Sequence, residues 1–249
     1  MIIKRYQRIR SIAYPFDKRE YGNKLIFSII CRSFSTTISI IFYKIGISPN
    51  FVSILSIFIG CLGIYNLFIA DFAIGSIMVS LCKFLDCVDG ELARIKNKFS
   101  NKSSLLEPLN SDLQYLFLLP AISSGLYLIN KIDLLYFILS VISSGCYVII
   151  RKIWNIKAWK GEKNLSWFQR ILYCQFKPSG KLRSVNKLGA NLYYLKYNLI
   201  AQNGIMYPSL VILSFYNFEI LPYYVYFFII LYFSFFSLTL FGFLLIKIP

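Results

Sequence analysis

Long apolar stretches separated by short polar segments dominate the hydrophobic pattern of this chain. A membrane-spanning helix needs about 20 mostly apolar residues, and stretches of that length predict six such helices. We expect these spans at about residues 51–70, 73–96, 104–129, 134–151, 198–216 and 221–246. The predicted fold class is therefore an all-α integral membrane protein with six transmembrane helices.

An apolar segment before these spans, residues 25–45, has a polar face that includes Arg32 and several hydroxyl residues. This pattern favours an N-terminal interfacial juxtamembrane helix, lying in the headgroup plane, over a further span. Pro49 then opens the first span, because proline is favoured at the start of a helix. We therefore divide the chain into a basic cytoplasmic N-terminus with its interfacial helix, residues 1–48, and one six-helix membrane domain, residues 49–249.

Lysine and arginine gather in three segments, residues 1–24, 94–102 and 151–196. Cytoplasmic loops of membrane proteins collect basic residues, so we predict that these segments and both termini are cytoplasmic. The net charge of +16 is then explained by topology and by attraction to anionic lipid, and no nucleic-acid partner is expected. The first 24 residues are basic rather than apolar, which argues against a cleavable signal peptide.

The composition narrows the chemistry that the chain can perform. Hydrophobic residues make up 57% of the sequence, charged residues only 15%, and histidine is absent. Any polar catalysis must therefore use carboxylates, hydroxyls, lysines or arginines. The six cysteines form no Cys-x-x-Cys pair, and we interpret them as reduced residues that pack between helices.

Several ionisable residues lie together at the predicted cytoplasmic end of the second span. Charged groups at membrane depth are costly, which makes them candidates for function. At 100° per residue, Asp86, Asp89, Gly90 and Ala93 fall within roughly a 100° arc of one helix face. Two carboxylates beside a residue without a side chain suit a divalent cation and a phosphate-bearing ligand. For the other charges we prefer the simpler interpretation of a helix end emerging into water: Glu91, Lys96, Lys98 and Lys102.

The stretch Asp86-Cys-Val-Asp89-Gly90-Glu-Leu-Ala93-Arg94 resembles the first half of the CDP-alcohol phosphotransferase signature, D-x-x-D-G-x-x-A-R, at every fixed position. Ile47-Ser-Pro49-Asn50 is similar to the family's entry to its first span, and Arg32 to part of its juxtamembrane helix. The resemblance covers about residues 22–130. It implies that Asp86 and Asp89 bind Mg²⁺ or Mn²⁺, which holds the CDP diphosphate. Gly90, Ala93 and Arg94 would then line the nucleotide pocket.

The second half of the signature, G-x-x-x-D-x-x-x-D, is altered in this chain. Aligned with it, Ser103 stands at the glycine, Glu107 at the third aspartate and Ser111 at the fourth, with Asp112 one residue later. The resemblance implies that Glu107 is a further metal ligand and that Asp112 is the catalytic base. On a straight helix Asp112 lies about 140° around from Glu107, so this base role needs a local distortion, for which Pro108 is a candidate.

Both residues of this second half have an alternative role. Ser104-Leu-Leu-Glu107 is also typical of a capping box at the start of the third span. Asp112 could instead be a buried polar packing residue. The sequence leaves these alternatives open, and with them the question of activity.

The resemblance implies a membrane enzyme that moves a substituted phosphate from a CDP-alcohol to an alcohol with release of CMP, in phospholipid or related lipid biosynthesis. The donor would be CDP-diacylglycerol or a soluble CDP-alcohol, and the acceptor a polyol, a polyol phosphate or a lipid alcohol. The Asp-Gly-Glu-x-Ala-Arg form looks like members with inositol-phosphate-like acceptors, which favours the first donor. The altered second half keeps an alternative open, a catalytically degenerate member that binds nucleotide, lipid or a partner subunit. The oligomeric state also stays open, a homodimer included.

Overall fold

The computed structural model describes residues 12, 26–96, 103–159 and 205–244, and every element within the last three ranges is helical. The predicted juxtamembrane segment 25–45 forms one helix, α3. The remaining helices follow the predicted spans, and a short 3-10 helix precedes the last one. The elements are α3 (Ile26–Ile45), α4 (Pro49–Phe68), α5 (Phe72–Lys96), α6 (Ser103–Leu128), α7 (Leu134–Trp159), α10 (Tyr207–Tyr216), η3 (Phe218–Ile220) and α11 (Leu221–Leu244).

The helix bounds agree with the predicted spans to within a few residues, with two exceptions. Helix α7 continues to Trp159, beyond the predicted end at residue 151. The predicted span 198–216 corresponds to α10, and its first part lies outside the described residues, as do residues 1–11, 13–25, 97–102 and most of the basic segment 151–196. The start of α4 is as predicted, because Ser48 caps the helix by accepting from Phe51 N at 3.2 Å and Pro49 follows it.

Three helices of the described part are long and apolar enough to cross a membrane: Pro49–Phe68, Leu134–Lys152 and Phe218–Leu238. Helices α5 and α6 have 25 and 26 residues, which is sufficient length. Their apolar character is interrupted by the charged and amide side chains that the site and the core contain. Length and composition therefore support three of the six predicted spans, and the other three stay predictions.

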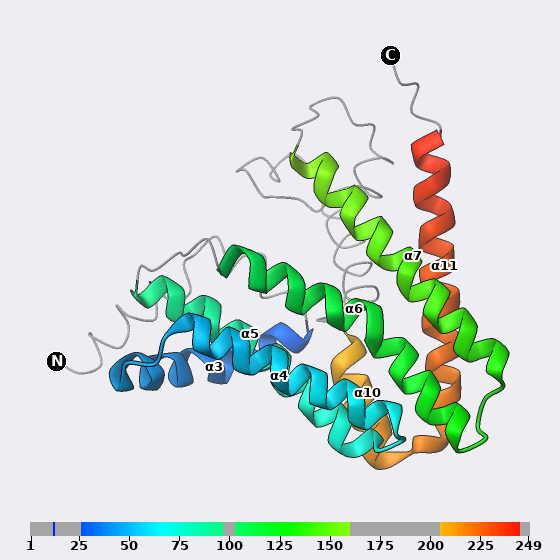
Figure 1. The fold of residues 1–249 in the computed structure, drawn as a ribbon, viewed down its shortest axis with the longest axis horizontal. Coiled ribbons are helices and arrows are strands. Elements are labelled where there is room, and N and C mark those ends of the chain that lie inside the picture. Colours follow the sequence, from blue (N-terminus) through cyan, green and yellow to red (C-terminus); the bar gives the residue numbers. More distant parts are fainter. Residues whose placement is uncertain (1–11, 13–25, 97–102, 160–204, 245–249) are drawn as a thin grey trace.

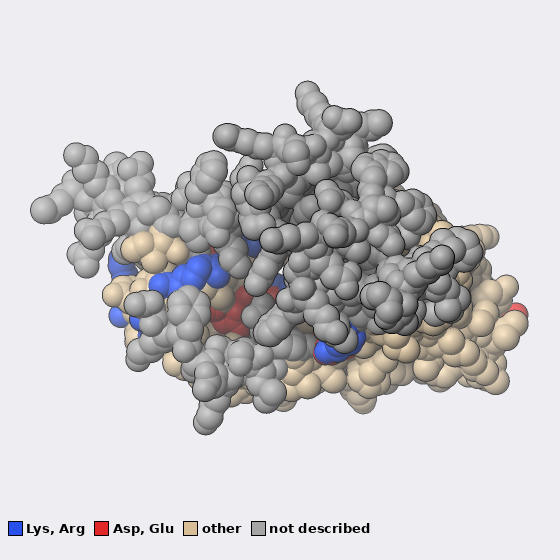
Figure 2. Space-filling view, turned by 90° about the horizontal axis from the view of Figure 1, so that it is seen from above, with Lys and Arg blue, Asp and Glu red and all other residues tan. Residues whose placement is uncertain are grey.

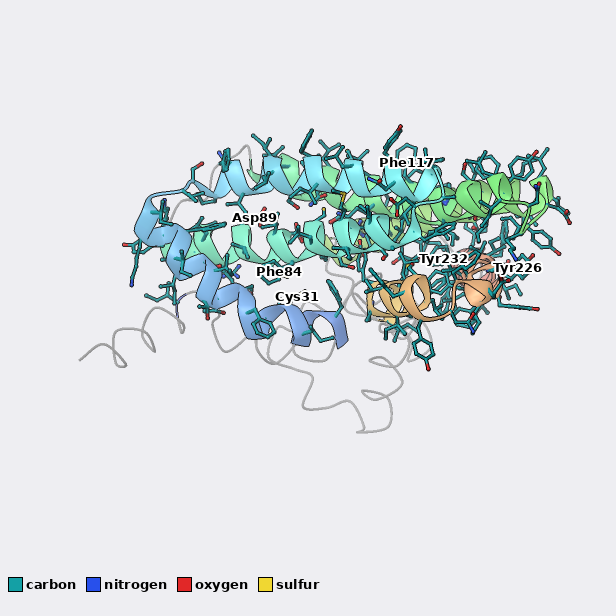
Figure 3. The ribbon with its side chains drawn as sticks, turned by 90° about the horizontal axis from the view of Figure 1, so that it is seen from below. Cys31, Phe84, Asp89, Phe117, Tyr226 and Tyr232 are labelled. Carbon is teal, nitrogen blue, oxygen red and sulfur yellow. The ribbon has the colours of Figure 1, made fainter. Side chains whose placement is uncertain are left out.

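The helices form a bundle in which α5 lies between α3 and α4 (Figures 1 and 3). Helix α4 also packs against α6, and α6 packs against α7. Helices α7 and α11 run side by side, while α10 packs against α5 (Figure 1). This order places the end of α5 beside two neighbouring helices, α3 and α4.

Two glycines allow the central helices to approach closely. A Cβ atom at Gly63 of α4 would lie 2.8 Å from the backbone nitrogen of Val79 in α5. A Cβ atom at Gly125 of α6 would collide with the carbonyl oxygen of Leu67 in α4. Any larger residue at either position would therefore push the helices apart.

A buried hydrogen-bond network joins α4, α5, α6 and α10. Ser56 Oγ donates to the Cys82 carbonyl at 2.8 Å, and Asn110 Nδ2 donates to Ser56 Oγ at 3.1 Å. Gln114 Nε2 donates to Asn110 Oδ1 at 3.0 Å, and the Tyr207 hydroxyl donates to Gln114 Oε1. Buried polar groups that are all paired in this way fix the register of the helices that carry them.

Three hydroxyl residues of α3 face the protein interior, while Thr37 on the same helix is exposed. Ser35, Thr36 and Ser39 are buried, whereas Ile30 and Phe34 on the same helix are exposed. The helix itself was predicted correctly, and its place in the headgroup plane stays a prediction. The three buried hydroxyls need hydrogen-bond partners, and α5 supplies one.

Candidate active site

Helix α5 is continuous from Phe72 to Lys96, so the motif residues have helical spacing. Asp89 faces α4, where Ser53 Oγ donates to its Oδ2 at 2.5 Å. Figure 3 shows Asp89 at the side of α5 that borders α4. One carboxylate of the predicted metal pair is therefore held in place by a neighbouring helix.

Asp86 lies one helical turn before Asp89 and forms an ion pair with Lys83 of the same helix. Both side chains are mostly buried, at 13% and 16% exposure. A partly buried carboxylate needs a positive partner, because its charge is costly away from water. Lys83 supplies that charge here, and it was not among the residues predicted for the site.

Gly90 directly follows Asp89 and lies about one turn before Arg94 on the same helix, where it is half-buried. A Cβ atom placed there would have Arg94 Nη1 at 3.5 Å and Nη2 at 3.9 Å as its nearest described neighbours. These are ordinary van der Waals distances, so the fold itself does not require glycine at this position. Arg94 lies beside this position, and the role of Gly90 in leaving room for a ligand stays a prediction. Ala93, on the same face, is buried.

Glu91 is not a solvated charge, and the sequence interpretation was wrong on this point. The residue is 1% exposed, and its carboxylate accepts hydrogen bonds from two hydroxyls of α3. Ser35 Oγ donates to Oε1 at 2.8 Å and Ser39 Oγ donates to Oε2 at 3.1 Å. The polar face of α3 thus has its partner in α5.

Lys96 was also expected to be a solvated charge, but it contacts the backbone between α3 and α4. Its ammonium group donates to the carbonyl oxygens of Gly46 at 3.0 Å and Ile47 at 2.6 Å. A lysine is favourable here because the last carbonyls of a helix carry partial negative charge. Lys98 and Lys102 lie outside the described residues.

Asp112 of α6 faces α7. Arg151 Nη1 lies 3.1 Å from its Oδ1, and Lys152 pairs with its Oδ2. The Arg151 guanidinium also lies 4.2 Å from the ring centre of Tyr115. Helix α6 is assigned as one continuous α-helix through Pro108. The structure therefore shows Asp112 engaged with two cations of α7, and its role as a base stays a prediction.

Glu107 belongs to α6, but its side chain lies outside what the structure describes. Helix α6 begins at Ser103, one residue before the serine of the predicted capping box, Ser104. Neither the metal-ligand role of Glu107 nor its capping role is tested here. Both stay predictions.

The described donors fit a divalent cation in their chemistry. Asp86 and Asp89 offer carboxylate oxygens one turn apart, and Mg²⁺ is commonly held by one or two carboxylates together with substrate phosphates. No group of three His, Cys, Asp or Glu residues comes together within the described part of the chain. A cation at this site would therefore depend on these two aspartates, on the ligand's phosphates, and on Glu107 if that side chain reaches them.

Figure 2 shows acidic and basic side chains near one another toward the left and centre of the view. The described surface at the right of the view is mostly uncharged. Sequence reasoning found the acidic pair but missed the side chains that hold it, Ser53 on Asp89 and Lys83 on Asp86. Arg151, which pairs with Asp112, was missed as well. It also missed the link between Glu91 and α3. The sequence did contain an indication of this contact. Ser35 and Ser39 are four residues apart, so they lie on one face of an otherwise apolar helix.

The sequence model of the CDP-alcohol phosphatidyltransferase family matches residues 46–214. This match covers more than half of the chain, and it includes the Asp86–Arg94 motif as well as all of α4, α5 and α6. No curated protein and no solved structure matches the chain. On the strength of this match, the chain belongs to the CDP-alcohol phosphatidyltransferase family.

Proposed function

We propose that this protein is an active membrane phosphotransferase that moves a phosphatidyl or headgroup phosphate from a CDP-alcohol to an alcohol acceptor, releasing CMP. Family membership supports phosphotransfer from a CDP-alcohol. The observation that carries the proposal is the end of α5, where Asp86, Asp89 and Arg94 lie within a few residues of Gly90 and only the Arg94 guanidinium, at ordinary van der Waals distance, is a described neighbour of a Cβ placed there. The proposed donor is CDP-diacylglycerol, with a soluble CDP-alcohol as the other candidate.

The reaction is a displacement at phosphorus. The acceptor oxygen forms a bond to the β-phosphorus of the donor, while the bond from that phosphorus to the bridging oxygen breaks. CMP leaves with the bridging oxygen, and the acceptor's proton passes to a base. Positioning and charge neutralisation supply most of the catalysis in such a displacement. The acceptor class that the motif favours is a polyol or polyol phosphate.

The proposed roles are those that the family resemblance implies for each residue. Asp86 and Asp89 would hold Mg²⁺ or Mn²⁺, with Glu107 as a further ligand, and the cation when bound neutralises charge on the diphosphate. Gly90, Ala93 and Arg94 would border the nucleotide. Asp112 would accept the acceptor's proton, and this transfer competes with its ion pairs to Arg151 and Lys152.

A second candidate function is a catalytically degenerate member that binds nucleotide or lipid without turnover. The engagement of Asp112 with two cations favours it, since both carboxylate oxygens already have partners. Serine at the fourth motif position, Ser111, favours it as well. Both candidates share the nucleotide site, so binding alone does not separate them.

The test uses the purified full chain in nanodiscs with Mg²⁺ or Mn²⁺ and a panel of CDP-alcohols, with CMP release as the readout. Metal-dependent CMP release with at least one donor is expected. A rate that chelator leaves unchanged, or no CMP from any donor, would contradict an enzyme of this class. Nucleotide binding without any CMP release would instead support the degenerate candidate.

A further inference from the structure

The Glu91 carboxylate of α5 accepts hydrogen bonds from the buried face of α3. Ser35 and Ser39, one turn apart on α3, donate to its two oxygens, and Ser39 also lies 3.3 Å from the Val88 carbonyl. At the end of the same helix pair, Lys96 binds the carbonyls that follow α3. Helix α3 is therefore attached to α5 at two levels along its length.

Arg32 lies on the same face of α3 as these hydroxyls. Relative to Arg32, Ser35, Thr36 and Ser39 follow at three, four and seven residues, a spacing that keeps them within about a 100° arc. The Arg94 guanidinium of α5 is close enough to be attracted by the carboxylates of Glu91 and Asp89 and repelled by the guanidinium of Arg32, so the two arginines come together only where carboxylates offset their charge. The orientation of α3 therefore determines how far Arg32 lies from the arginine of the motif.

Glu91 and Asp89 lie on opposite sides of Gly90, each about 100° around the helix from it. Asp89 contacts α4 through Ser53, and Glu91 contacts α3 through Ser35 and Ser39. The open face at Gly90 thus lies between two helices that are each fixed to α5 by a carboxylate. Only one of these carboxylates, Asp89, is a proposed metal ligand.

We propose that Glu91 is a positioning residue, which fixes α3 against α5 and so keeps Arg32 within reach of Arg94 at the site for the donor's diphosphate. This inference rests on the proposed function for the identity of the ligand. The positioning acts through hydrogen bonds to the α3 hydroxyls. Glu91 itself touches neither the donor nor the acceptor.

The first test compares Glu91→Ala with Glu91→Gln in donor kinetics. Alanine removes both acceptors, so the donor KM should rise roughly tenfold or more while kcat changes by less than about threefold, as expected for lost ground-state positioning. Glutamine should keep the KM within about threefold of wild type, because its carbonyl accepts from Ser35 and its amide can donate to Ser39, whose hydroxyl turns to the Ser35 carbonyl at 2.8 Å. Glu219→Gln is the matched control, since it removes an ion-paired carboxylate far from the site.

The second test asks whether Glu91 acts through Arg32. Arg32→Met alone should raise the donor KM, and adding Glu91→Ala to it should raise the KM no further, because coupled residues are not additive. Fully additive effects would contradict the proposal, as would an unchanged KM with a reduced kcat. If Glu91→Ala does not fold, Ser35→Ala replaces it, and a smaller KM rise is expected there while Ser39 still donates.

A third readout does not depend on turnover. Cys31 of α3 is 4% exposed, and Figure 3 shows it on the helix that Glu91 holds. Maleimide labelling of Cys31, read by peptide mapping, should be slow in wild type and Glu91→Gln and several-fold faster in Glu91→Ala, with buried Cys82 as the internal control. Protection of Cys31 in Glu91→Ala would overturn the positioning role. Absence of CMP release from wild type would instead overturn the proposed function, and the labelling result would still stand.

Discussion

Gly90 is the one residue of the site whose small size the fold does not explain. The described surroundings leave ordinary van der Waals space for a Cβ atom there, bounded by the Arg94 guanidinium. In a helix interior, glycine costs about 1 kcal/mol relative to alanine. A glycine that destabilises its helix without a packing reason points to close approach by a ligand.

We therefore predict that Gly90→Ala keeps or slightly raises thermal stability but weakens donor binding by roughly tenfold, about 1.4 kcal/mol. Melting in detergent and titration with a CDP-alcohol measure the two effects separately. Gly125→Ala is the contrasting variant, since its added Cβ would collide with the Leu67 carbonyl and should lower stability. Donor affinity that is unchanged in Gly90→Ala would remove this residue from the nucleotide site.

Asp112 and Ser111 compete for the fourth motif position, and their roles separate by substitution. If Asp112 is the base, Asp112→Asn should lower kcat by about 10²–10⁴-fold, the usual loss when a positioned base is removed, while Ser111→Ala has little effect. Nucleotide binding should persist in Asp112→Asn and be lost in Asp86→Asn and Asp89→Asn. Wild-type turnover in Asp112→Asn together with loss in Ser111→Ala would assign the family position to Ser111.

The residues of the α5 motif could be predicted from sequence because they lie on one helix, whose geometry is fixed by 3.6 residues per turn. Their partners could not, because helical periodicity gives the face on which a side chain lies but not the neighbouring helix that meets it. Glu91 shows this limit: its position near a helix end suggested water, while Ser35 and Ser39, more than 50 residues earlier, bury it. Asp112 shows it again, with partners on α7.

Among the elements, α10 depends on a polar contact with α6 for its place in the bundle. The buried Tyr207 hydroxyl donates to Gln114, which belongs to the network with Asn110 and Ser56. Leaving a buried acceptor without its donor costs about 1–3 kcal/mol. This contact joins a helix late in the chain to the layer that contains the site.

Tyr207→Phe should accordingly lower the free energy of unfolding by about 1–3 kcal/mol, because Gln114 Oε1 loses its buried donor. Tyr216→Phe at the other end of α10 is the control, since that side chain is 90% exposed and should change stability little. Chemical denaturation in mixed micelles measures both. Equal stability of the two variants would show that the contact between Tyr207 and Gln114 does not support α10.

The helix bounds were the most predictable part of the elements, because apolar length and turn residues are local properties of the sequence. Pro49 at the start of α4 is an example, with Ser48 capping the helix as its sequence position allows. Membrane crossing was harder to establish for α5 and α6, since the polar groups of the site and the network lower their apolar character. In these two helices the polar side chains that the site and the network need also make the helices less apolar than a typical membrane span.

At the scale of the whole molecule, two ends of the described bundle differ in charge and contacts. One end contains the Asp86–Arg94 motif of α5 and the ion pairs that Asp112 forms with Arg151 and Lys152. At the other end Lys131, in the turn between α6 and α7, binds both carboxylate oxygens of Glu219 at 2.9 Å. Of the predicted cytoplasmic segments, the basic residues that the structure describes, among them Arg94, Lys96, Arg151 and Lys152, belong to the first end.

Helix α7 connects these two ends and gives the last prediction. From Leu134 to Lys152 it rises about 28 Å at 1.5 Å per residue, close to the roughly 30 Å of a bilayer's hydrocarbon core. Because basic residues favour the cytoplasmic side, Lys152→Cys should react with an impermeant maleimide only from the cytoplasm and Lys131→Cys only from the opposite side. Both positions are accessible enough to label, with side chains 51% and 36% exposed, and permeabilised membranes should label both. Peptide mapping distinguishes them from the native cysteines. Labelling of both from one side of intact membranes would show that α7 does not cross, and the predicted topology, with its site facing the cytoplasm, would fail with it.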